Sequence, residues 1–94
     1  MGADVGLFLP QLRMDFPTIR DRVHRAEALG FHSVWFMDHL TPPAGPGYDC
    51  FEGWTLASAL AGTTEQIRLG HLVLCDAFRH PALLAKMAAT LDVI

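Results

Sequence analysis

Cysteine is scarce in this chain of 94 residues, which contains only Cys50 and Cys75. The two lie far apart and in no CxxC arrangement, so the sequence supports neither a disulfide framework nor a cysteine-based zinc site. Basic residues are also few, because seven Lys and Arg are dispersed along a chain with a formal net charge of −3. No basic stripe is available to neutralise a phosphate backbone. We therefore expect reduced thiols, no metal and no nucleic-acid partner.

Long apolar segments are absent as well. No basic amino-terminal region leads into one, and no window reaches the roughly 18 uninterrupted apolar residues that are needed to span a bilayer. We therefore expect a cytoplasmic protein with no membrane partner. The chain also lacks a GxGxxG or GxxxxGK[ST] turn after its first apolar run, which disfavours the Rossmann and P-loop nucleotide-binding folds.

The composition is that of a globular protein or a piece of one. Hydrophobic residues make up 51% of the chain and charged residues 18%, which is too apolar for intrinsic disorder. A chain of this length forms one domain at most and buries somewhat over 60% of the surface that its unfolded form exposes. A modest hydrophobic core is therefore possible.

Three short apolar runs alternate with three amphipathic or apolar helical patterns. The runs cover residues 5–9, 33–37 and 67–74, and the helical patterns follow at 16–29, 54–61 and from Pro81 to Leu91. Asp15 can cap the first helix, and Gly30 can end it in a left-handed conformation. No hairpin turn separates the runs, and each is apolar on both sides. This order predicts the α/β class, with parallel strands in the order βαβαβα and helices covering the sheet.

Polar side chains gather after each predicted strand. Gln11 follows the first strand, Asp38 and His39 follow the second, and Cys75 lies after the third. Because the carboxyl ends of parallel strands share one edge, these residues should lie together where α/β folds place their chemistry. Residues 38–52, rich in Pro and Gly, leave from the same edge as a candidate substrate loop.

His39 is the strongest candidate for a catalytic group, because imidazole titrates near neutrality and can exchange a proton with a bound molecule. It could equally cap the start of the loop. Asp38 could orient His39 or, more simply, cap the loop backbone. Arg79 and His80, at the start of the third helix, could bind an anion, or serve only as a solvated side chain and a helix cap. His71 inside the third strand is more typical of a core residue than of a ligand.

Five stretches of the sequence form a recognisable combination. They are GLFLPQ at 6–11, AEALGF at 26–31, SVW at 33–35 with MDH at 37–39, IRLG at 67–70, and FRHPALLAKMA at 78–88. Together they resemble the amino-terminal part of the luciferase-like flavin or deazaflavin monooxygenase superfamily. Residues 51–56, FEGWTL, and the stretch at 78–88 most resemble its coenzyme F420 branch.

The resemblance implies a (β/α)8 TIM barrel, of which this chain would supply the first three βα units. Residues 1–94 would then be the amino-terminal part of one incomplete domain, since a full barrel needs about 250 residues. The implied function is that of an oxidoreductase or monooxygenase. It would transfer a hydride or oxygen between reduced F420, or alternatively FMN, and a small organic substrate. The isolated fragment is expected to be inactive.

The resemblance also assigns roles to individual residues. His39 matches the family's active-site histidine after the second strand. The counterpart of a non-prolyl cis peptide that lies against the cofactor ring would be Leu72-Val73. Gln11 and Cys75 would line the pocket.

Two other function classes stay open. One is a non-catalytic short barrel relative that binds flavin or a partner without turnover. The other is a metal-dependent hydrolase, suggested by His39, His71, Asp76 and His80, although no HxH or HExxH pair supports it. In each case the first and third strands would expose unpaired edges. We therefore expect the chain to self-associate, to pair with a complementary fragment, or to fold poorly.

Overall fold

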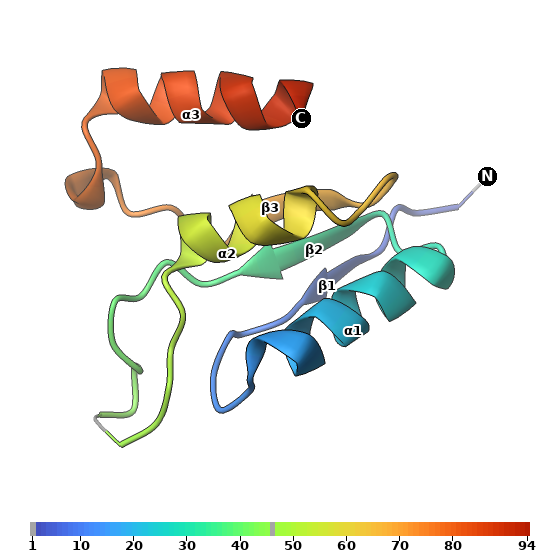
Figure 1. Ribbon diagram of the computed structural model, residues 1–94, viewed down its shortest axis with the longest axis horizontal. Coiled ribbons are helices and arrows are strands. Elements are labelled where there is room, and N and C mark those ends of the chain that lie inside the picture. Colours follow the sequence, from blue (N-terminus) through green and yellow to red (C-terminus); the bar gives the residue numbers. More distant parts are fainter. Residues whose placement is uncertain (1, 46) are drawn as a thin grey trace.

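The computed structural model describes residues 2–45 and 47–94 and has the expected βαβαβα order. Strand β1 (Gly6–Phe8) is followed by helix α1 (Phe16–Ala28), β2 (Ser33–Phe36) and α2 (Gly53–Ala61). Strand β3 (Arg68–His71), the short 3₁₀ helix η1 (Asp76–Phe78) and α3 (Pro81–Val93) complete the chain (Figure 1). The strands are shorter than the apolar runs that predict them, because the pairing between neighbours ends at Phe8, Phe36 and His71.

The strands form one parallel sheet in the order β1-β2-β3, which confirms the α/β prediction. Trp35 of β2 lies opposite Phe8 on one side and Gly70 on the other. Helices α1 and α2 cover the same face of this sheet, since their apolar side chains join those of β2 in one core. The buried core residues are Leu9, Ile19, Val23, Ala26, Val34, Phe36, Leu56, Ala57, Leu60 and Ile67.

The opposite face of the sheet carries the indole of Trp35 across its neighbours. A Cβ on Gly6 would lie 2.8 Å from the indole Nε1, and one on Gly70 would lie 2.7 Å from its Cζ3. The indole Nε1 donates to Ser33 Oγ at 2.8 Å. Gly70 is therefore explained by close packing of a side chain from the adjacent strand. This face is otherwise uncovered, and both Phe8 and Trp35 are partly exposed.

The two ends of α1 bear out the capping signals in the sequence. Asp15 Oδ1 accepts a hydrogen bond from Thr18 N at 2.8 Å, and Gly30 has a φ of 85°. A further contact of α1 was not predicted from the sequence. In it, Glu27 Oε2 accepts hydrogen bonds from three backbone N–H groups at the entrance to β3. These belong to Glu65, Gln66 and Ile67, at 2.9, 2.6 and 2.9 Å. The N–H of Ile67 contributes most to the lowered pKa of Glu27.

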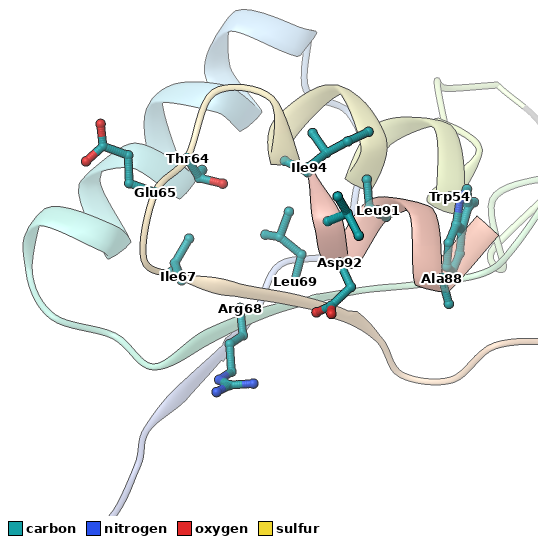
Figure 2. A pocket seen from close by; sticks show the side chains of 12 residues that line it. Trp54, Thr64, Glu65, Ile67, Arg68, Leu69, Ala88, Leu91, Asp92 and Ile94 are labelled. Atoms are coloured by element: carbon teal, nitrogen blue, oxygen red, sulfur yellow. The ribbon is translucent and has the colours of Figure 1, made fainter. Parts of the chain in front are cut away.

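Helix α3 forms as predicted but buries none of its residues against the rest of the chain. It stands apart from the sheet and from α2 (Figure 1). A cavity of about 480 Å³ lies between them, lined by side chains of α2, β3 and α3 (Figure 2). The apolar face of α3, which includes Leu83 and Leu91, is not packed against another element of the described chain, although such a face normally is. No helix in the described ranges has the length and apolar character needed to cross a membrane.

Candidate functional site

The carboxyl ends of β2 and β3 bring His39 and the Leu72-Val73 segment to one edge of the sheet. Phe36 pairs with His71 in the parallel register, and the N–H of Leu72 donates to the carbonyl of Phe36 at 2.8 Å. The residues that follow on the two strands therefore leave the sheet side by side. The expectation that these segments share an edge is confirmed.

The surface at this edge is both apolar and polar. The peptide bond between Leu72 and Val73 is cis, as expected from the resemblance, and their side chains are 55% and 69% exposed. His39 is exposed as well, whereas Met37 and Asp38 before it are buried. An accessible imidazole thus lies at the same edge as an accessible apolar surface, which suits a planar ligand with hydrogen-bonding atoms on its edge.

Gln11 is fully buried and holds the end of β2 in place. Its Nε2 donates to the carbonyls of Met37 at 2.7 Å and Phe51 at 3.1 Å, and its Oε1 accepts from Met37 N at 2.9 Å. The amide is therefore committed to the backbone on both its donor and acceptor sides. The predicted contact between Gln11 and a cofactor stays a prediction. The Gln11 amide supports the backbone at Met37, directly before Asp38 and His39.

An ion-pair network lies next to His39 in the sequence, because it includes Asp38. Its other members are Glu52 and Arg79. Arg79 binds Asp38 through two parallel hydrogen bonds of 2.8 Å each, and its Nη2 also donates to Glu52 Oε2 at 2.8 Å. Asp38 Oδ2 further accepts from Cys75 N at 2.7 Å. The side chains of Asp38 and Arg79 are only 2% and 10% exposed. This network joins three segments that are distant in the sequence.

The network corrects two sequence-based interpretations. Arg79 is not a solvated side chain, because it is nearly buried between two carboxylates. Among the described residues, the Asp38 carboxylate neither caps its own loop nor binds the His39 side chain, because it binds Cys75 N at the exit of β3 and Arg79 instead. Glu52 was missed altogether, although an acidic residue directly before the second helix was a signal. Its carboxylate caps α2 by accepting from Trp54 N and Thr55 N at 3.0 and 2.8 Å.

The charges of the network stabilise one another. The Arg79 guanidinium beside Asp38 holds the pKa of that carboxyl below its usual range, and Asp38 in turn raises the pKa of Arg79. Burial pushes the pKa of Glu52 upward, but its hydrogen bonds from Thr55, Trp54 and Arg79 outweigh burial and bring the pKa below its ordinary value. All three side chains therefore remain charged at neutral pH.

Acid should weaken this network. A carboxyl group whose pKa is lower in the folded chain stabilises the fold above its unfolded pKa, about 3.9 for Asp, and loses this effect as the pH falls through its folded pKa. We expect the free energy of unfolding, measured with urea at a series of pH values, to fall below about pH 4. Asp38→Asn should show a shallower fall, whereas Asp21→Asn, on the exposed side of α1, should match the parent chain. Identical slopes for both variants would contradict the assignment.

Two other histidines that the sequence singled out, His71 and His80, have structural contacts of their own. His80 caps α3, since its Nδ1 accepts from Ala82 N at 3.1 Å, which confirms the simpler interpretation. His71 lies in the helix-facing layer, stacked on Trp54 with ring centroids 5.5 Å apart, and within the described chain its Nε2 has no hydrogen-bond partner. Across residues 2–45 and 47–94, no three His, Cys, Asp or Glu residues come together to hold a metal ion.

The candidate substrate loop folds back on the first strand connection. Cys50 pairs with Leu12 in an isolated antiparallel bridge, and its Sγ–H donates to the His39 carbonyl at 3.5 Å. Arg13 N donates to Asp49 O at 3.3 Å. Burial raises the pKa of the Cys50 thiol, so it remains protonated at neutral pH. Cys75 is half-buried, and its backbone rather than its thiol contacts Asp38.

Comparison with known proteins finds similarity over nearly the whole chain. The family model "Luciferase-like monooxygenase" matches residues 3–94. F420-dependent glucose-6-phosphate dehydrogenase of Microbacterium testaceum is 35% identical over 93% of this chain and 24% of its own length. F420-dependent hydroxymycolic acid dehydrogenase of Mycobacterium tuberculosis is 35% identical over 99% of this chain and 26% of its own.

Solved structures show the same fold. An F420-dependent secondary alcohol dehydrogenase in complex with an F420-acetone adduct superimposes with a TM-score of 0.84 and 27% identity, over 98% of this chain and 28% of its own. F420-dependent tetrahydromethanopterin reductase of Methanopyrus kandleri gives a TM-score of 0.77 and 26% identity, over 95% and 23%.

The chain thus spans about a quarter of the length of these relatives and matches the amino-terminal part of their barrels. Its three parallel strands and its family match agree with one another. The chain belongs to the luciferase-like monooxygenase family, and the relatives described above are F420-dependent enzymes of that kind.

Proposed function

We propose that residues 1–94 are part of one barrel domain and form one side of the cofactor site of an F420-dependent oxidoreductase. Such an enzyme would transfer a hydride between the cofactor and a small organic substrate. The observation that carries this proposal is the exposed imidazole of His39 at the same edge as the exposed side chains of Leu72 and Val73. The names of the similar dehydrogenases support the choice of F420 over FMN.

The residues at this edge fit a deazaflavin ring. When bound, the ring would supply a two-electron carrier with a flat apolar face and polar edge atoms. Leu72 and Val73 would support the face, because together they expose a large apolar surface. His39 would donate a hydrogen bond, or hold and release a proton, because an imidazole can act as a general acid or base. Cys75 would line the rim next to Asp38.

The test is a binding titration of the chain with F420 and, separately, with FMN. We expect F420 fluorescence to change saturably, and FMN to bind more weakly. His39→Ala should weaken F420 binding at least about 10-fold, the loss of roughly one hydrogen bond to the ligand. His32→Ala is the matched control, because this exposed histidine precedes β2 at the opposite end of the sheet. No saturable response to F420, or equal effects of both substitutions, would overturn the proposal.

A second readout separates catalysis from binding. The chain supplies about a quarter of a full-length relative, so a non-catalytic F420-binding protein is the competing function. Incubation of the F420-loaded chain with small alcohols and sugar phosphates distinguishes the two. Loss of the absorbance of oxidised F420, dependent on substrate and on His39, would support the oxidoreductase. Binding with no such loss would favour the non-catalytic alternative.

We further propose that the chain associates through its open surfaces. Strands β1 and β3 each have one unpaired edge, and α3 buries no residue. Size-exclusion chromatography with light scattering should therefore give a mass above 10.3 kDa that depends on protein concentration. A monomer at every concentration that also melts cooperatively would contradict this expectation. A mixed complex with a fragment carrying the rest of a related barrel would support pairing with a complementary piece.

A further inference from the structure

We propose that Arg79 is a positioning residue, which aligns the backbone at His39 with the segment 72–75 by binding Asp38 and Glu52 at the same time. This inference rests on the proposed function, because its consequence is a pre-arranged surface for the cofactor ring. Within the described residues, the side-chain hydrogen bonds of Arg79 go to the carboxylates of Asp38 and Glu52, and none goes to His39. Its effect on the imidazole and on the apolar surface of Leu72 and Val73 therefore passes through these carboxylates and the backbone that they bind.

The first step is the link between the exits of β2 and β3. Asp38 precedes His39 in sequence, and its Oδ2 accepts from the N–H of Cys75, two residues after Val73. One carboxylate therefore connects both halves of the candidate site. The two parallel hydrogen bonds from Arg79 fix the orientation of that carboxylate, since a bidentate pair permits little rotation.

The second step is the link to helix α2. The Nη2 atom that binds Asp38 Oδ1 also binds Glu52 Oε2 at 2.8 Å, and Glu52 caps the first turn of α2. The guanidinium carbon lies 5.9 Å from the centre of the Trp54 ring on the same turn. Arg79 thus joins the β2 exit, the β3 exit and the start of α2 at one point.

The position of Arg79 between two carboxylates favours an arginine over other residues. The Arg79 side chain is 10% exposed and its hydrogen bonds are directed at protein carboxylates, so it is not available as a surface anion site. Without its charge, Asp38 and Glu52 would face each other with no cation between them. Lysine would restore the charge. Its single ammonium cannot bind one carboxylate through two parallel hydrogen bonds and a second carboxylate at the same time, as the planar guanidinium does.

The experiment compares Arg79→Lys and Arg79→Met with Arg22→Met, an exposed arginine of α1 that serves as the matched control. Amide hydrogen exchange is followed at Leu72 and Cys75, whose N–H groups bind Phe36 O and Asp38 Oδ2. The amide of His32, which binds Val5 O at the other end of the sheet, reports on the fold as a whole. F420 affinity is measured in parallel.

For Arg79→Lys we expect exchange at Leu72 and Cys75 to accelerate at least 10-fold while exchange at His32 stays within twofold, together with at least 10-fold weaker F420 binding. Arg79→Met should exaggerate both local effects, and Arg22→Met should cause neither. Unchanged exchange at the two site amides in Arg79→Lys would overturn the inference. So would an equal acceleration at His32, because that result indicates a purely structural role.

The two proposals fail in different ways. If the parent chain does not bind F420, the proposed function fails, while the exchange measurement still decides whether Arg79 aligns the two strand exits. If the parent chain binds F420 and Arg79→Lys binds it equally well despite faster exchange, Arg79 organises the backbone without preparing a cofactor surface, and the positioning role is overturned.

Discussion

Replacing Gln11 with leucine is expected to destabilise the chain by about 3 kcal/mol, because it leaves buried backbone groups without partners. The amide of Gln11 satisfies both the N–H and the C=O of Met37, and also the carbonyl of Phe51. Leucine has a similar volume but cannot hydrogen-bond, and an unsatisfied buried backbone group costs roughly 1–3 kcal/mol. Urea unfolding at a fixed protein concentration would measure the loss.

Gln66→Leu is the control for this substitution. Gln66 is exposed, and its recorded hydrogen bond comes from its backbone N–H rather than its side chain. Its replacement should change the free energy of unfolding by less than about 0.5 kcal/mol. If both substitutions had effects of similar size, the buried amide of Gln11 would not be the support that the structure indicates.

Gly53→Ala is expected to destabilise the chain by about 2 kcal/mol or more, although alanine is the better helix former. A Cβ at Gly53 would lie 2.5 Å from the carbonyl oxygen of Met37 and 3.0 Å from Cδ2 of His71. The Met37 oxygen cannot withdraw freely, since it accepts the 2.7 Å hydrogen bond from Gln11. Either α2 or the end of β2 must shift. The measurement is the thermal midpoint and the urea midpoint of the variant.

Gly62→Ala, at the cap directly after the same helix, provides the comparison. Its Cβ would lie 3.7 Å from the Ala59 carbonyl, an ordinary contact, and its φ is −70°. Alanine there should be neutral or slightly stabilising, by up to about 1 kcal/mol. Equal destabilisation at both glycines would mean that the close approach of α2 to Met37 does not govern stability.

The sequence was sufficient to predict the elements and their connection. Apolar runs of strand length, helical patterns between them and no hairpin signals permit little besides a parallel sheet. The capping role of Asp15 and the left-handed Gly30 followed from local chemistry and are confirmed. The place of His39 followed from topology, because parallel strands end on the same side of a sheet, whereas the choice of Leu72-Val73 came from the family resemblance.

The contacts that organise the site could not be predicted in the same way. Arg79 meets Asp38 across 41 positions of sequence, and Gln11 meets Phe51 across 40. Nothing local marks such partners, since an arginine or glutamine after a strand is usually solvated. The lack of packing around α3 was also missed. In the sequence, the apolar face of α3 has the same pattern as that of a helix packed on a sheet. The structure shows that α3 buries no residue and stands apart from the sheet.

The indole of Trp35 has a spectroscopic consequence. The chain contains two tryptophans, which lie on opposite faces of the sheet. Trp54 of α2 stacks on His71 on the helix-covered face, whereas Trp35 lies on the uncovered face. Indole emission moves to shorter wavelength when water is removed from around the ring. Trp54→Phe would leave Trp35 as an intrinsic fluorescent probe of this face of the sheet, and its emission wavelength would report when another polypeptide covers the face.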